Sequence, residues 1–162
     1  MEEMENTREV FNKELHSVTL QQFESKFFQF MQLYHQLLTT LKVPVTLENG
    51  EKAVKEGREF FSFFTEEVYA AYTLADKAGK DEITLFENIY EDIYDEYKNV
   101  LGPYFRNINF LIKFIDQSTE VGTDEGKSFY AQILRAQLSN DEVTAIAYHG
   151  FSSEGRWFSG YT

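Results

Sequence analysis

The chain has 162 residues, no cysteine, and 27 acidic against 15 basic side chains, for a formal net charge of −12. The lack of cysteine excludes disulfides, thiolate zinc sites and thiol catalysis. Aromatic residues make up 17% of the chain, far more than disordered segments carry. No apolar run approaches the roughly 18 residues of a membrane span, and the acidic start is unlike a signal peptide. Composition therefore predicts one folded, soluble domain over residues 1–162.

The negative charge is concentrated in the first part of the chain. Residues 1–100 hold 20 acidic and 10 basic side chains, net −10, and residues 101–162 hold 7 and 5, net −2. Nucleic acids and anionic lipids are bound mainly through Lys and Arg, so a broad surface of that kind is not expected in the first part.

Residues 5–41 contain neither glycine nor proline, and their apolar side chains recur every three or four residues. This spacing predicts a long amphipathic helix that ends before Pro44. Its stripe consists of Leu20, Phe23, Phe27, Phe30, Tyr34, either Leu37 or Leu38, and Leu41. After a loop at residues 48–50, the same spacing predicts a second helix from Val54 to Ala75, followed by a break.

The apolar residues of the segment 83–100 follow steps of 3, 4, 3, 4 and 3, the heptad spacing of a helix seam. Seven acidic residues and no basic one lie within residues 81–97. Glu87, Glu91 and Asp95 stack at intervals of four, where like charges repel each other. This stripe predicts either a solvated face or a surface for a basic protein partner, and the seam itself could join two copies in a homo-oligomer.

Gly102-Pro103 is expected to end this helix and to start a fourth one, because proline suits the first helical turn. After a surface loop at residues 117–127, residues 129–138 predict a fifth helix. Ser139 and Glu142 have the spacing of a capping box, which predicts a short sixth helix directly after Ser139.

Strand-like alternation is essentially missing, so the sequence predicts an all-α, single-domain helical bundle. It should contain about five to six helices, with the long ones at the N-terminus. Residues 152–162 are expected to form a weakly structured tail.

No catalytic or metal-binding motif stands out. The histidines His16, His35 and His149 lack the Glu-x-x-His spacing of di-iron bundles, and HExxH, phosphate-loop and dinucleotide-binding motifs are absent. The sequence therefore predicts no metal and no cofactor, and it gives catalysis no positive support.

Two arginines lie among apolar neighbours in the C-terminal part. Such an arginine usually packs its stem at the edge of the core or pairs with a buried polar group. Alternatively, the two guanidinium groups converge on an anionic ligand such as a phosphate. The candidate ligand-binding residues are Tyr104, Arg106, Asn107, Arg135 and Gln137.

An arginine followed by a polar residue also resembles the ribonuclease motif of HEPN domains, R-x(4–6)-H. Positions 111–113 hold Leu, Ile and Lys, and seven residues separate Arg8 from His16, so the motif is broken. An HEPN-like ribonuclease with a degenerate active site is therefore an alternative interpretation.

Four groups of motifs occur in chain order: FESKFFQFMQLYH at residues 23–35, GREF at 57–60, LGPYFRN with KFID at 101–116, and FYAQILRAQLS with YHG at 129–150. They resemble the bacterial phage abortive infection family putAbiC. The resemblance extends over about residues 20–151, and RAQLS is its most specific part.

The resemblance implies a role in antiviral defence, in which infected cells halt or die before phage spreads. Family members commonly carry two transmembrane helices ahead of this domain, and none occurs in this sequence. The expected location is thus the cytoplasm, or the cytoplasmic face of the inner membrane in a longer protein. Phe110 replaces the histidine of the family's R-N-L-Y-H motif, which argues against an activity that needs that histidine.

Together, these features predict a cytosolic sensor or effector domain of a phage-defence protein that acts by binding rather than catalysis. A protein partner or a phage component is the expected ligand, and self-association is expected. The second alternative is an acidic interaction protein that mimics DNA through its acidic helix.

Overall fold

The computed structural model describes residues 2–152. Its elements are α1 (Glu2–Thr40), β1 (Lys42–Thr46), β2 (Lys52–Glu56), α2 (Arg58–Leu74), α3 (Glu82–Asp116), α4 (Asp124–Gln137) and α5 (Asn140–Phe151). Five helices and one small hairpin confirm the predicted all-α fold over this part of the chain.

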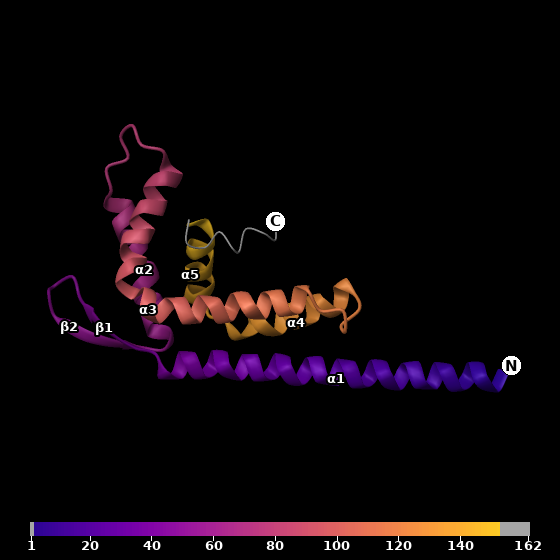
Figure 1. The fold of residues 1–162 in the computed structure, drawn as a ribbon. Coiled ribbons are helices and arrows are strands. Elements are labelled where there is room, and N and C mark those ends of the chain that lie inside the picture. The colour runs from indigo at the N-terminus through magenta and orange to yellow at the C-terminus, as the bar shows by residue number, and fades with distance from the viewer. Residues whose placement is uncertain (1, 153–162) are drawn as a thin grey trace.

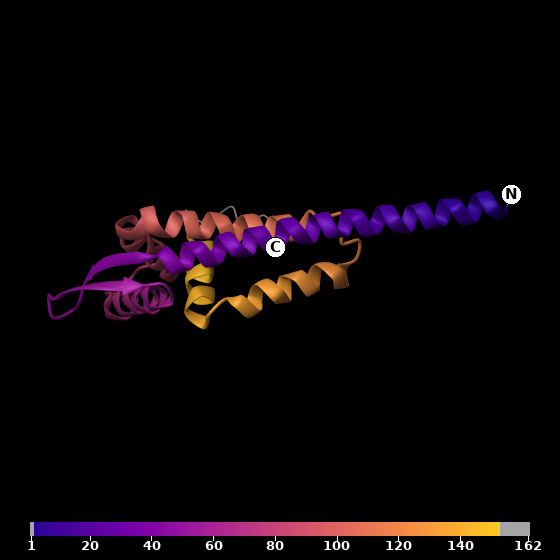
Figure 2. The ribbon, with the colours of Figure 1, turned by 90° about the horizontal axis from the view of Figure 1, so that it is seen from below.

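The helices form two groups that cross each other (Figure 1). One group contains α1, the C-terminal part of α3, and α4. The other contains α2, the N-terminal part of α3, and α5. The N-terminal half of α1 extends beyond both groups (Figure 2), and residues 3–18 are exposed along its length. Within the described part of the chain, no helix, α1 included, has the length and apolar composition needed to cross a lipid bilayer.

A hairpin occupies the region where the sequence predicted a loop and the first turn of a helix. β1 and β2 pair antiparallel, from Lys42 opposite Glu56 to Thr46 opposite Lys52. The prediction that strands are missing was wrong, because five residues per strand are too few for alternation to stand out. The predicted helix start at Val54 was also wrong, since Val54 lies in β2 and α2 begins at Arg58.

The prediction that Gly102-Pro103 ends a helix was wrong as well, because α3 continues through both residues to Asp116. The helix instead changes direction near this point (Figure 1). Proline lacks an amide proton and its ring disturbs the preceding turn, which bends a helix rather than ending it when both halves pack against a core. The N-terminal half of α3 thus packs in one group of helices and the C-terminal half packs in the other.

The remaining boundaries follow from local capping. Thr123 caps α4 through its side-chain oxygen, so the helix begins about one turn before the predicted residue 129. Ser139 and Glu142 form the predicted capping box, which is confirmed. The predicted weakly structured tail lies outside the described residues, except for Ser152.

Aromatic rings hold both groups of helices together. Between α1 and α3, the centroids of Phe23 and Phe114 lie 4.9 Å apart. Between α2 and α3, the Phe60 and Tyr97 rings meet edge-to-face at 5.3 Å. Such pairs contribute about 0.5–1.5 kcal/mol beyond the area that they bury. Within the predicted heptad seam, Phe86, Tyr90 and Tyr97 thus pack against α2, whereas Ile83 is exposed. Self-association stays a prediction.

Gly57 links the hairpin to α2 with φ 52° and ψ −126°, a conformation that only glycine adopts readily. A Cβ at this position would lie 3.4 Å from the carbonyl oxygen of Leu38. We therefore expect Gly57→Ala to lower the free energy of unfolding by about 1–3 kcal/mol in urea titrations. Gly50→Asn, at a turn with φ 81° and open space, is the matched control and should cost less than about 1 kcal/mol. Equal losses in the two variants would contradict this account of Gly57.

Candidate functional site

The most elaborate polar cluster within residues 2–152 surrounds the carboxylate of Glu142, which has no exposed surface. The hydroxyls of Tyr34 and Tyr104 donate to its Oε1 over 2.8 Å and 2.9 Å. Its Oε2 accepts from Nε of Arg58 at 3.1 Å and from the amide of Ser139 at 2.8 Å. We call this set, with the carbonyl of Gln137, the Glu142 network.

Each member of the Glu142 network comes from a different place in the fold. Tyr34 lies near the end of α1, Arg58 is the first residue of α2, and Tyr104 follows the bend in α3. Glu142 lies in the first turn of α5, where a carboxylate is favoured by the unpaired amides and the helix dipole. The network therefore joins four helices at one buried point.

Arg58 also ties the network to the junction between α4 and α5. Its Nη2 donates to the carbonyl oxygen of Gln137 over 2.6 Å. The hydroxyl of Tyr34 lies 3.1 Å from the same oxygen, but it lies closer to Glu142. The Arg58 side chain is 52% exposed, whereas Glu142 is fully buried, so the guanidinium group connects the interior with the surface.

The environment keeps both tyrosines protonated. Burial raises the pKa of Tyr34 to about 12. The hydrogen bond with Arg58 lowers this pKa, and the hydrogen bond to Glu142 raises it further. Burial, followed by the charge of Glu142, raises the pKa of Tyr104 still further. The pKa of Arg58 is also raised, mainly by its interaction with Tyr34. Both hydroxyls thus act as hydrogen-bond donors to Glu142 near neutral pH.

A second buried polar group, His149, lies on α5 beside α3. Its ring stacks on Phe105, with centroids 4.1 Å apart, and its Nδ1 lies 3.0 Å from the hydroxyl of Tyr90. Burial lowers the pKa of His149 to about 4, so the ring is neutral near pH 7. A neutral ring stacked in this way is part of the core packing between α3 and α5.

The structure brings only some of the predicted ligand-binding residues together. Tyr104, through its hydroxyl, and Gln137, through its carbonyl, lie in the Glu142 network. Arg106 is exposed, and its Nη1 packs against the backbone of Gly102, close to the Tyr94 hydroxyl. Asn107 is buried, with an Oδ1 that has no hydrogen-bond partner within the described chain.

Arg135 is exposed at the end of α4, where its Nη1 donates to the carbonyl of Leu138 over 3.4 Å. No hydrogen bond or ion pair in residues 2–152 joins it to Arg106. The arginine that enters the buried network is Arg58, which sequence reasoning did not select. Its position directly after Gly57, within the GREF motif, was the available signal.

The predicted acidic stripe lies on α3. Glu87 and Glu91 are partly buried, and Asp95 is exposed and bonded to Lys98 over 3.1 Å. Its role as a partner surface stays a prediction. Among residues 2–152, no group of three or more carboxylates and histidines is arranged to hold a metal ion.

Removing the carboxylate at the centre of the Glu142 network should destabilise the fold strongly. Glu142→Ala removes the acceptor of the Tyr104 hydroxyl and of the Ser139 amide and leaves Arg58 and Tyr34 only the Gln137 carbonyl. It should cost about 3–5 kcal/mol of unfolding free energy. Urea titration followed by circular dichroism measures this loss. Glu125→Ala, in the exposed first turn of α4, is the matched control and should cost at most about 1 kcal/mol. A similar loss in both variants would contradict the central role of Glu142.

The lowered pKa of His149 predicts a stability change in mildly acidic solution. Between pH 6.5 and about 4 the unfolded chain binds the proton and the folded chain does not, so stability falls as the pH drops through this window. The loss is on the order of 3 kcal/mol when complete. Thermal unfolding at a series of pH values should show a shallower dependence for His149→Gln than for the wild type. His16→Gln, on the projecting part of α1, is the control, and an unchanged slope in His149→Gln would refute the prediction.

Comparisons with curated proteins and with solved structures find no match to this chain. The C-terminal segment, which includes Tyr104, the α4–α5 junction and Glu142, does match a known family. Residues 96–162 match the model of the family described as "Putative phage abortive infection protein", putAbiC, which confirms the predicted resemblance for this part of the chain.

Proposed function

We propose that this chain serves in bacterial defence against phage, and that it does so by binding another molecule rather than by covalent chemistry. The observation that carries the proposal is the match of residues 96–162 to the phage abortive infection family. The proposed place of action is the cytoplasm, or the cytoplasmic face of the inner membrane.

The state of the buried carboxylate supports binding over catalysis. Both oxygens of Glu142 already accept two hydrogen bonds each, from groups on three helices and from Ser139, the residue that caps α5. A general acid or base must reach the proton that it transfers. Glu142 instead fixes Arg58 and the α4–α5 junction in place, which is what a preorganised binding surface needs.

The exposed arginines supply the polar groups of the proposed binding surface. Arg106 and Arg135 both lie within the matched segment and are exposed, and neither forms an ion pair within the described chain. Guanidinium groups recognise carboxylates and phosphates through paired hydrogen bonds. We therefore assign to the ligand, a phage component or a protein partner, anionic groups that contact these side chains separately.

A phage challenge tests this function. Cells that express the chain should form fewer plaques than cells with an empty vector, and at high phage input they should stop growing before lysis. The double variant Arg106→Ala, Arg135→Ala should lose at least about tenfold of this protection, because each charge-assisted contact contributes about 1.5–3 kcal/mol. Plaque counts and growth curves measure both effects.

The matched control is Arg8→Ala with Lys13→Ala, which removes two positive charges from the projecting part of α1. This variant should protect like the wild type. No protection by the wild-type chain would contradict the defence role, whereas full protection by the Arg106, Arg135 variant would contradict only the assigned surface.

A further inference from the structure

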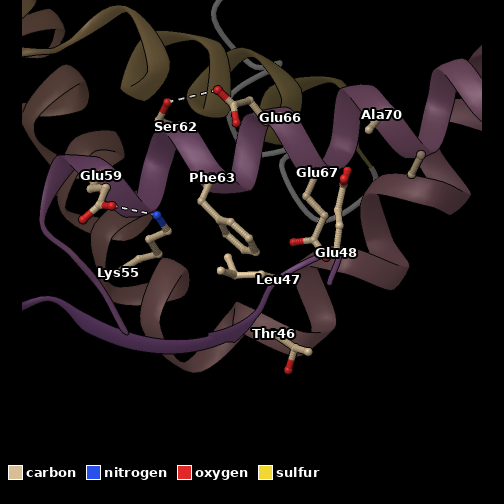
Figure 3. Close-up of a pocket in the computed structure, with 11 residues that line it drawn as sticks. Thr46, Leu47, Glu48, Lys55, Glu59, Ser62, Phe63, Glu66, Glu67 and Ala70 are labelled. Carbon is tan, nitrogen blue, oxygen red and sulfur yellow. Dashed lines mark hydrogen bonds and ion pairs between the residues drawn. The ribbon is translucent and has the colours of Figure 1, made fainter. Parts of the chain in front are cut away.

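A cleft of about 750 Å³ lies between the end of β1 and one side of α2. In Figure 3, Phe63 of α2 and Leu47 of the hairpin turn point toward each other, and Ala70 lies farther along the helix. The cleft thus has an apolar lining of the kind that small ligands and single side chains occupy, and its volume lies in the usual range of about 300–1,000 Å³.

The polar groups of the cleft are mostly carboxylates. Its lining includes Glu48, Glu59, Glu66 and Glu67 against a single lysine, Lys55. Lys55 is already bonded to Glu59 over 2.6 Å (Figure 3). Glu66 lies on the other side of α2 and accepts a hydrogen bond from Ser62 (Figure 3). Within the described residues, no cation is bonded to Glu48, Glu66 or Glu67. The cleft is therefore complementary to a positively charged group.

One of these carboxylates is incompletely satisfied. Oε2 of Glu67 is buried and has no hydrogen-bond partner within residues 2–152. Burial raises the pKa of Glu67, the charge of Glu96 adds to the shift, and the Tyr97 hydroxyl opposes it. A buried acceptor without a partner costs about 1–3 kcal/mol, a cost that is removed if the carboxyl group turns toward a donor bound in the cleft. Glu67 therefore borders the cleft with one oxygen that no donor of the described chain satisfies.

We propose that this cleft binds a basic peptide segment, with one arginine or lysine side chain donating to Glu67 and Glu48 and a neighbouring apolar side chain packing against Phe63 and Leu47. A guanidinium group fits these requirements best. It donates to two carboxylates at once, and its flat face packs on an aromatic ring. The site is separate from the Glu142 network, so it does not depend on the proposed function.

Titration with a matched pair of peptides tests this site. Acetyl-Leu-Arg-Leu-amide should shift the backbone NMR signals of residues 46–48 and 62–71. Acetyl-Leu-citrulline-Leu-amide, which has nearly the same shape without the charge, should bind at least about fivefold more weakly. Equal affinity for the two peptides, or shifts confined to other regions, would overturn the proposal.

Glu67→Gln provides the second arm of the experiment. It keeps the side-chain size and removes the charge, and it should weaken binding of the arginine peptide at least about fivefold. The melting temperature should not fall, because a buried charge is removed. Glu14→Gln makes the same change in net charge on the exposed part of α1 and should leave affinity within about twofold. Equal effects of the two variants would show that only net charge matters and would refute the site.

Discussion

The fold depends on one buried carboxylate, that of Glu142. Burying a charge costs several kcal/mol unless it is paired and hydrogen-bonded. Here four donors meet that requirement, and they come from α1, α2, α3 and the start of α5. The network can form only when all of these elements are correctly placed. A polar group of this kind therefore specifies one arrangement of helices, whereas aromatic contacts alone tolerate small shifts in packing.

The bend in α3 makes this arrangement possible. The first half of α3 packs on α2 through Tyr90 and Tyr97, and the second half packs on α1 through Phe114. Tyr104 follows Pro103 directly, so its hydroxyl enters the network at the point where the two helix groups cross. A straight helix could not serve both groups. The proline that sequence reasoning interpreted as a helix boundary is thus the residue that orients the site.

Helices and caps, which follow from the spacing of residues near each other in the chain, were predictable from the sequence. Contacts between residues far apart in the chain were not. The aromatic stripes gave the helices, and the spacing of Ser139 and Glu142 gave the cap of α5, because both signals are local. The hairpin was missed since its strands are short and Gly57, not an alternating pattern, marks its end. The network was missed since Arg58 and Glu142 are 84 residues apart in sequence. The capping spacing revealed the local role of Glu142 but not its partners.

Burial and charge together explain why two acidic residues behave so differently. Glu142 is fully buried, yet it has four donors, and its role is to hold the fold together. Glu67 is only partly buried, but one of its oxygens has no partner within the described chain, and it borders an open cleft. A satisfied carboxylate stabilises the structure around it, whereas an unsatisfied one next to a cavity favours a ligand that supplies the missing donor. The number of hydrogen bonds that each carboxylate accepts, rather than its burial alone, therefore distinguishes Glu142, which stabilises the fold, from Glu67, the candidate binding residue.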